Sequence, residues 1–216
     1  DYVLSVDFMK ILYISLGCDK NLSDSEEMLG LLTANGHEIV DSEEEADAIV
    51  INTCCFIHDA KEESVNTILE MAEYKKSGTC KALIVTGCMA QRYKEEITQE
   101  IPEVDAVLGT TSYGDIVKAL NEVQAGNVFQ EFRDINELPE DCGHRVITTG
   151  GHFGYLKIAE GCDKHCTYCI IPSLRGKFRS VPEERLLKQA EYMASQGVRE
   201  LILVAQETTV YGTDLY

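Results

Sequence analysis

Residues 48–54 read Ala-Ile-Val-Ile-Asn-Thr-Cys, an apolar run of strand length that ends in polar residues and a cysteine. A continuous apolar run of this length is typical of a strand buried on both faces of a parallel sheet. Similar runs lie at 11–16, 82–85 and 104–108, and a shorter one lies at 37–40. Amphipathic stretches separate these runs, so the sequence predicts an α/β fold with a doubly wound parallel sheet.

Helices are expected between these strands. The tetrad Ser23-Asp-Ser-Glu26 fits a capping box, in which a hydroxyl and a carboxylate each satisfy a free backbone N–H at a helix start. Apolar residues between 65 and 72 recur at the spacing of one helix face, and a last helix is predicted from Ser112 to about Gly126. These elements place an amino-terminal sheet domain over residues 9–125.

Residues 126–152 are interpreted as a linker, because they show little periodicity, an acidic middle and turn-forming residues at both ends. After the linker, a strand at 153–159, a helix at 182–195 and a strand at 200–205 are predicted. A barrel of repeated strand–helix units begins with this order of elements. We therefore expect residues 153–216 to hold the start of such a barrel, which two strands cannot close.

The composition is that of an ordinary globular protein, with 44% hydrophobic and 26% charged residues. No apolar run is long enough to span a bilayer, and the residues before Met9 lack the basic start and apolar core of a signal peptide. We expect Met9 to be the natural start and the preceding residues to be an upstream extension. Nine cysteines without an export signal indicate metal ligands and buried thiols rather than disulfides, so the predicted location is cytoplasmic.

Three cysteines stand close together in the stretch Cys162-Asp-Lys-His-Cys166-Thr-Tyr-Cys169. Their spacing brings three thiolates to one inorganic core without a fourth protein ligand, which leaves one iron of an iron–sulfur cubane open for a substrate or cofactor. A zinc site is the alternative, but zinc normally takes four ligands in two separated pairs. His165 is poorly placed as a fourth ligand, because reaching the same ion from beside Cys166 would strain the backbone.

Three further cysteines follow predicted strands: Cys18 after the first, Cys54 after the third and Cys88 after the fourth. The carboxyl ends of parallel strands lie along one edge of a sheet, so these thiols can meet although they are far apart in the sequence. Gly17 and Gly87 would let the backbone approach a bulky inorganic group. Three unrelated buried thiols are the alternative, since free cysteine is often buried; the three equivalent positions favour a second cluster.

The other three cysteines are assigned no ligand role. Cys55 adjoins Cys54, but neighbouring side chains on an extended segment point to opposite faces, and Cys54 is preferred. Cys80 precedes a strand and Cys142 lies in the linker, so both are interpreted as free thiols.

Several of these segments resemble one known family. Residues 154–182 resemble the cluster loop of radical S-adenosylmethionine (SAM) enzymes, and of the methylthiotransferases in particular. Residues 15–26, 52–54 and 86–88 are similar to the three motifs of the amino-terminal domain of methylthiotransferases. The resemblance covers nearly the whole chain and implies that the second unit is the start of a radical SAM (β/α) barrel.

The resemblance also implies the cofactors, which are S-adenosyl-L-methionine and two 4Fe-4S clusters. The three later cysteines would hold the cluster that splits SAM into a deoxyadenosyl radical, and the cysteines after the strands would hold the cluster that carries sulfur. No catalytic residue beyond these ligands is assigned. The predicted SAM contacts are Tyr168, Gln206 and Glu207, although a capped strand end also explains the last two.

The family has a branch that modifies transfer RNA and a branch that modifies a ribosomal protein. Three segments favour the protein branch: residues 19–21, where the RNA branch typically has glutamine and methionine before the asparagine, residues 171–176, and residues 205–216. The implied reaction adds a methylthio group to the β carbon of an aspartate in the small-subunit ribosomal protein S-twelve. A transfer RNA methylthiotransferase acting on adenosine next to the anticodon and a non-catalytic iron–sulfur protein are the alternatives.

Net charge is a weaker argument for the same partner. With 19 basic against 37 acidic residues the formal charge is −18, and such a surface repels phosphate backbones and attracts basic partners such as ribosomal proteins. Direct nucleic-acid binding and membrane binding are therefore not expected for this part of the chain, and the resemblance implies a low-potential electron donor. Acidic runs such as residues 42–45 are otherwise simply solvated faces.

Arg175, Lys177 and Arg179 form a small basic cluster after the predicted iron site. By resemblance, Arg175 lies near the substrate entrance and could meet a carboxylate; a solvated loop is the alternative. The carboxyl-terminal substrate-recognition domain typical of the family is absent from this sequence, and the barrel is incomplete. We hypothesise that these residues are a truncated fragment, which holds the first cluster but is not expected to turn over alone.

Overall fold

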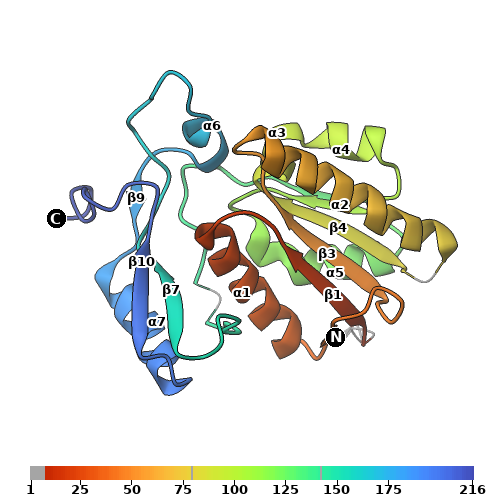
Figure 1. Ribbon diagram of the computed structural model, residues 1–216, viewed down its shortest axis with the longest axis horizontal. Coiled ribbons are helices and arrows are strands. Elements are labelled where there is room, and N and C mark those ends of the chain that lie inside the picture. The colour runs from red at the N-terminus through yellow and green to blue at the C-terminus, as the bar shows by residue number, and fades with distance from the viewer. Residues whose placement is uncertain (1–7, 79, 142) are drawn as a thin grey trace, which may run out of the picture.

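Figure 1 shows a computed structural model of the chain, which describes residues 8–78, 80–141 and 143–216. The fold is built on a six-stranded sheet. All neighbouring strands pair in parallel, in the order β2-β1-β3-β4-β5-β6. The strands are β1 (Lys10–Ser15), β2 (Glu38–Val40), β3 (Ala48–Thr53), β4 (Ala82–Gly87), β5 (Ala106–Leu108) and β6 (Phe129–Glu131). This arrangement confirms the predicted doubly wound parallel sheet.

The strand order reverses between β1 and β3. Strand β2 lies on one side of β1, and from β3 onward the chain adds each new strand on the other side. Ligands of open α/β sheets bind outside the carboxyl ends of the strands at such a reversal. The segments that follow β1 and β3 therefore stand where the topology forms a crevice.

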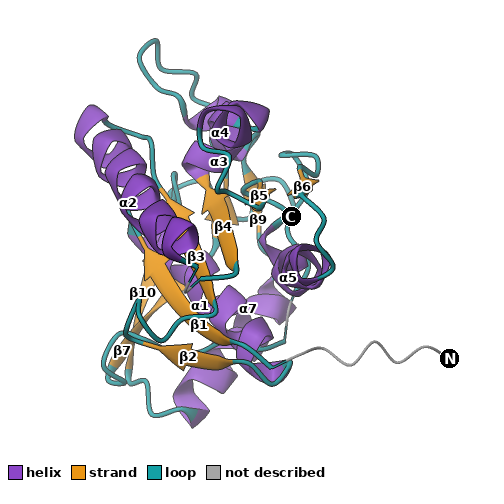
Figure 2. Cartoon of the chain, turned by 90° about the vertical axis from the view of Figure 1, so that its right-hand side faces the viewer, coloured by secondary structure: helices purple, strands orange, loops and turns teal. Residues whose placement is uncertain are grey.

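Helices cover both faces of the sheet (Figure 2). One face carries α2 (His58–Ser77), α3 (Cys88–Tyr93) and α4 (Glu95–Glu100), and the other carries α1 (Asp19–Ala34) and α5 (Ile116–Gln124). Strand β3 contributes side chains to the cores on both faces, because successive side chains of a strand point to opposite faces of the sheet. Ile49 and Ile51 belong to the apolar core under α2, whereas Ala48 and Val50 belong to the core under α1 and α5.

The predicted capping box at Ser23-Asp-Ser-Glu26 is wrong. Helix α1 begins four residues earlier, at Asp19, with Cys18 as its N-cap residue, and no side-chain hydrogen bond caps it. All four residues of the tetrad lie inside the helix and are buried. Instead of free N–H groups at a helix end, the carboxylates of Asp24 and Glu26 bind basic side chains of the linker and the second unit.

Other boundaries differ from the sequence prediction by smaller amounts. Strand β5 begins at Ala106 rather than at 104, and α5 begins at Ile116 after the 3-10 turn η1 (Tyr113–Asp115). Strand β6 lies inside the predicted linker; its three half-buried residues carry too short a pattern to reveal an edge strand. Leu69, expected on the buried face of α2, is 48% exposed.

The second unit has its own small core, formed by Leu156, Ile158, Val181, Leu186, Met193 and Val198. Its elements are β7 (Phe153–Lys157), β8 (Ala159–Glu160), α6 (Ile171–Arg175), β9 (Arg179–Ser180), α7 (Glu183–Ser195) and β10 (Glu200–Val204). Strands β7 and β10 pair in parallel across α7, which is the start of a radical SAM type barrel, and β8 pairs with β9 antiparallel. The single strand predicted at 153–159 is thus divided after Lys157.

Helix α1 is the element that joins the two units, and Figure 1 shows it beside β7. Glu26, in the middle of α1, has no exposed surface. Its Oε2 accepts hydrogen bonds from Nε and Nη2 of Arg145 at 2.9 and 2.6 Å, and its Oε1 accepts from the backbone N–H and the hydroxyl of Thr148 at 2.7 and 2.8 Å. Arg145 Nη2 also donates to the carbonyl oxygen of Tyr155 in β7.

A helix that could span a membrane, with enough length and few charges, is not found among the described residues.

Replacing Arg145 with methionine should strongly destabilise the chain. The substitution leaves the Glu26 carboxylate buried without its cation, and removing one partner of a buried ion pair costs about 3–5 kcal/mol. Urea unfolding measures this loss. Lys118→Met is the matched control, because Lys118 is 57% exposed in its pair with Glu131, and we expect its effect to stay below about 1 kcal/mol. Equal losses of unfolding free energy in both variants would contradict the conclusion that the buried Glu26–Arg145 pair joins the two units.

Candidate functional site

A cavity of about 710 Å³ opens at the carboxyl edge of the sheet, between this edge and the second unit. It gathers every residue that the sequence predicted as a metal ligand or cofactor contact: Cys18, Cys54, Cys88, Cys162, Cys166, Cys169, Tyr168, Gln206 and Glu207. Among the described residues, however, no three His, Cys, Asp or Glu side chains converge closely enough to hold a metal ion. The fold thus brings the predicted ligands to one cavity without setting them in coordination geometry.

The first three cysteines reach the cavity from adjacent strand ends. Cys18 follows β1, Cys54 follows β3, and Cys88 is the first residue of α3 after β4; β3 pairs with both β1 and β4. Cys18 is exposed, whereas Cys54 and Cys88 are 6% and 7% exposed. All three lie at the carboxyl edge of the sheet, at or next to the strand-order reversal between β1 and β3, where open α/β sheets bind ligands.

The structure separates the two adjacent cysteines. Cys54 lines the cavity, whereas Cys55 packs into the apolar core under α2, and its thiol donates a hydrogen bond to the carbonyl oxygen of Cys88 at 3.3 Å. Burial raises the pKa of Cys55 to about 11. Cys80 also lies in that core and donates to the carbonyl oxygen of Ala82. Cys142 lies outside the described residues.

Two asparagines hold the loops of the first cysteine group together. Asn21 Nδ2 donates to the carbonyl oxygens of Leu16 and Thr53 at 3.0 and 2.9 Å, and Asn52 Nδ2 donates to the carbonyl oxygen of Asn21 and to Ser25 Oγ, both at 2.9 Å. These contacts tie the end of β1 to the end of β3. The sequence motifs include both asparagines but indicate no role for them, because Asn21 binds the carbonyl oxygen of Thr53, 32 residues away, and Asn52 binds that of Asn21, 31 residues away.

The glycines next to Cys18 and Cys88 lie where neighbouring loops approach closely. Gly17 has a φ of +94°, and a Cβ there would stand 2.7 Å from the Cβ of Cys54. At Gly87, with a φ of +91°, a Cβ would meet Asn52 Oδ1 at 2.3 Å. Both glycines therefore allow neighbouring loops to approach each other. The predicted reason, close approach to an inorganic group, is not tested by these contacts.

Arg175 is buried and bound by the protein's own carboxylates, so the solvated-loop interpretation is wrong. Its Nη1 donates to Asp24 Oδ2 at 2.8 Å and to Glu160 Oε2 at 2.9 Å, and its Nη2 donates to Asn21 Oδ1 at 2.6 Å. Lys157 also forms ion pairs with Asp24 and Glu160. This buried charge cluster fastens α6 and β8 to α1 directly beside the cavity.

The charge cluster sets the electrostatics on both sides of the cavity. Burial disfavours ionisation of Glu160, but Arg175 and Lys157 outweigh burial and lower its pKa to about 2. Burial raises the pKa of Cys88, and the guanidinium of Arg175 partly offsets that effect. Arg175 thus stands between a thiol of the first cysteine group and the carboxylate that binds Gln206 Nε2 at 3.2 Å.

The second cysteine group lies on the loop between β8 and α6. The backbone N–H of Cys169 donates to the carbonyl oxygen of Cys166 at 2.9 Å, and that of Cys162 donates to the carbonyl oxygen of Gly176 at 3.1 Å. His165 is exposed, has a φ of +45° and does not line the cavity, so the described geometry gives no support to a fourth protein ligand for zinc.

The predicted SAM contacts stand on the same wall as this loop. Tyr168 is 89% exposed at the cavity. Glu207 forms an ion pair with Lys164 and accepts hydrogen bonds from Thr209, and these contacts lower the pKa of Glu207 to about 2. Gln206 Oε1 is buried without a hydrogen-bond partner among the described residues. A buried acceptor without a donor fits a site that receives an N–H from a ligand.

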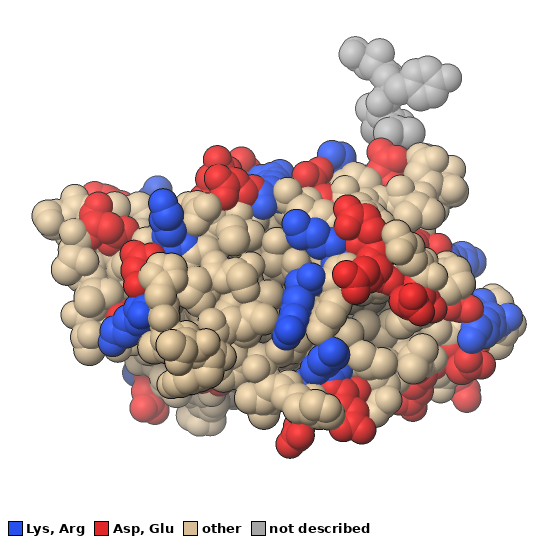
Figure 3. Space-filling view, turned by 90° about the horizontal axis from the view of Figure 1, so that it is seen from above, with Lys and Arg blue, Asp and Glu red and all other residues tan. Residues whose placement is uncertain are grey.

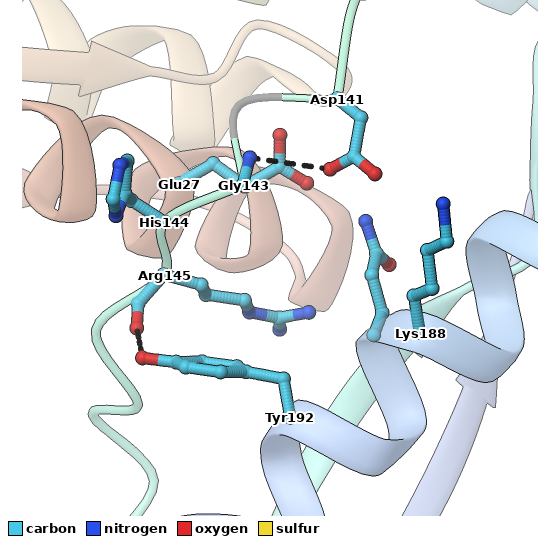
Figure 4. A pocket seen from close by; sticks show the side chains of 8 residues that line it. Glu27, Asp141, Gly143, His144, Arg145, Lys188 and Tyr192 are labelled. Atoms are coloured by element: carbon cyan, nitrogen blue, oxygen red, sulfur yellow. Dashed lines mark hydrogen bonds between the residues drawn. The ribbon is translucent and has the colours of Figure 1, made fainter.

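A second, smaller cavity of about 250 Å³ lies where the linker crosses α1 and α7 (Figure 4). Arg145, Tyr192 and Asp141 are part of its lining, and Tyr192 Oη donates to the carbonyl oxygen of Arg145 at 2.7 Å. Burial raises the pKa of Glu27, which also lines it. None of the predicted site residues lines this cavity. Its polar groups instead form contacts between the linker and α7.

Acidic and basic side chains are interspersed on the face seen from above in Figure 3. The formal charge of −18 therefore does not make this face uniformly negative. The charge argument for a basic partner is accordingly weak for this face.

Two parts of the chain match known families. Residues 10–109 match the uncharacterized protein family UPF0004, and residues 156–215 match the radical SAM superfamily. The first part holds the sheet with its three strand-end cysteines, and the second holds the loop with the other three. The cavity described above lies between the two matched parts.

Curated proteins resemble almost the whole chain. A protein of Lachnoclostridium phytofermentans named ribosomal protein uS12 methylthiotransferase RimO is 66% identical over 96% of this chain and 47% of its own length. Proteins of the same name from Clostridioides difficile and Acetivibrio thermocellus are each 50% identical over the same shares. The chain spans about half the length of the curated relatives it matches.

The different surroundings of the cysteines predict different reactivity toward iodoacetamide in the metal-free chain. Thiolate is the reacting species, and a pKa of about 11 leaves Cys55 only about one part in a thousand ionised near pH 8. We expect the exposed Cys18 and Cys166 to be alkylated at least about a hundredfold faster than Cys55, whose rate should rise as the pH approaches 11. Tandem mass spectrometry measures each site, with chain unfolded in guanidinium as the control, in which the rates converge. Equal rates in the folded chain would contradict the described burial.

Proposed function

Because the chain belongs to the radical SAM methylthiotransferase family, we propose that its protein adds a methylthio group to the β carbon of an aspartate in the small-subunit ribosomal protein S-twelve. The observation that carries this proposal is the single cavity lined by both groups of three cysteines. The names of the relatives support uS12 as the substrate. They favour it over transfer RNA and over a non-catalytic iron–sulfur protein.

The residues of the cavity fit the cofactors that the family implies. Each group offers three thiols and no fourth ligand, the donor set of a 4Fe-4S cluster with one open iron. We assign Cys18, Cys54 and Cys88 to one cluster and the three cysteines of the 162–169 loop to the other, with SAM beside Tyr168, Gln206 and Glu207. Bound there, these groups would supply the electron, the carbon radical, the sulfur and the methyl group of the reaction.

The chain's own residues position these groups. Arg175 and Asn21 keep the loop of Cys18 against the second unit, so the two cysteine groups share one cavity. Gln206 Oε1 is available to accept a hydrogen bond from the SAM amine, and its Nε2 is held by Glu160. Phe56, Ile57 and Leu174 add apolar side chains to the lining of the same cavity.

Further parts of the proposal follow from the same chemistry. A ribosomal-protein substrate implies a cytoplasmic location, and reductive cleavage of SAM implies a low-potential electron donor. We keep the division into residues 9–125, 126–152 and 153–216 as the proposed domain limits. Activity belongs to the whole protein, since this chain spans about half of its relatives.

Iron and sulfide analysis after anaerobic reconstitution tests the two-cluster assignment. Cys18→Ala and Cys166→Ala should each lose about one cubane, because two thiolates hold a cluster poorly. The adjacent cysteines give a matched pair: Cys54→Ala should also lose about one cubane, whereas Cys55→Ala, which points into the core, should keep both. Loss of iron in Cys55→Ala alone would reverse the assignment.

The substrate is tested by mass spectrometry with the reconstituted protein, SAM, a sulfide source and a reductant. We expect the mass gain of one methylthio group on the target aspartate of uS12 and none on transfer RNA. Cys166→Ala serves as the inactive control. A methylthio product on adenosine next to the anticodon, with uS12 unchanged, would replace the proposed substrate.

A further inference from the structure

Three basic side chains line the large cavity: Lys20, Lys164 and Arg175. Lys164 is paired with Glu207, and Arg175 is paired with Asp24 and Glu160. Glu207 is the one carboxylate among the described lining residues, and it is occupied by Lys164. Among the described residues, every charged side chain that lines the cavity therefore has an ion-pair partner, apart from Lys20.

Lys20 is half-buried on the first turn of α1, two residues after Cys18. Within the described part of the chain it takes part in no hydrogen bond and no ion pair, whereas the other two cations of the lining are both paired. Its position is also unfavourable for the helix, because the N-terminal turn carries partial positive charge and favours anions. Stability therefore does not explain a lysine at this position.

The reaction proposed above brings an anion to this cavity. The carbon that receives the methylthio group is the β carbon of an aspartate, and the side-chain carboxylate is bonded directly to that carbon. A productive substrate must therefore place its carboxylate inside the cavity, next to thiolate-bound groups that carry negative charge. A carboxylate in such a place needs a cationic partner, and a partly desolvated cavity strengthens that attraction.

We propose that Lys20 is the residue that binds the carboxylate of the target aspartate and so selects an acidic side chain as substrate. This inference rests on the proposed function and adds the basis of its specificity. Lys20 lies two residues after Cys18, at the start of α1, so it presents the carboxylate to the wall assigned to sulfur transfer. A neutral side chain of the same shape, such as asparagine, leaves the ammonium unpaired and binds more weakly.

Binding of two labelled peptides to the reconstituted protein with SAM tests this proposal independently of turnover. Both peptides carry the uS12 target sequence, one with the aspartate and one with asparagine in its place, and fluorescence anisotropy gives their affinities. We expect the wild type to prefer the aspartate peptide about tenfold, as a charge-assisted contact provides. Lys20→Gln should bind both peptides equally, and Lys20→Arg should keep most of the preference.

Controls separate substrate recognition from effects on the cofactors. Lys177→Gln removes an exposed lysine that does not line the cavity, and it should bind like the wild type. Iron content and SAM affinity should be unchanged in Lys20→Gln. A Lys20→Gln variant that loses iron or SAM affinity yet still prefers the aspartate peptide would overturn the inference, because Lys20 would then serve a cofactor.

The outcomes also distinguish this inference from the function on which it rests. Methylthio transfer to uS12 by a wild type that binds the aspartate and asparagine peptides equally would overturn the role of Lys20 alone. Absence of both peptide binding and methylthio product on uS12 would overturn the proposed function, and the inference with it. Equal preference for aspartate in wild type and Lys20→Gln would likewise reject Lys20 as the selecting residue.

Discussion

The contacts between acidic residues of α1 and basic residues of the linker and the second unit hold the structure together. Glu26 binds Arg145, and Asp24 binds Lys157 and Arg175, all of them buried. Charges removed from water must be matched in number and geometry, and each partner lies more than a hundred residues away. This requirement gives α1 one preferred docking position and thereby fixes the relation between the sheet and the second unit.

The cavity is a consequence of that docking. The strand-order reversal places the first cysteine group at the carboxyl edge of the sheet, and the ion pairs at α1 bring the 162–169 loop to face it. Arg175 has a part in both arrangements, because its guanidinium influences Cys88 on one side and Glu160 on the other. Both cysteine groups thus line one cavity, and the charges of the interface leave Lys20 unmatched within the described lining.

The errors of the sequence analysis have a common origin. The tetrad at 23–26 has the residue types of a helix start, and a local pattern cannot show that its carboxylates bind Arg145, Lys157 and Arg175. The sequence leaves a solvated loop open for Arg175 for the same reason, because its partner Asp24 is 151 residues away. Strand β6 was missed because a three-residue edge strand gains its stability from pairing with β5 rather than from its own pattern.

The sequence alone determined the class of the fold, the family and nine of the residues that line the cavity, because strand periodicity and cysteine spacing are local properties. Their roles as ligands and cofactor contacts stay predictions. Tertiary structure alone decided which carboxylates neutralise Arg175 and why Gly17 and Gly87 are required. These features depend on atoms that meet only after distant strands and helices have packed, and burial then sets the strength of their interactions.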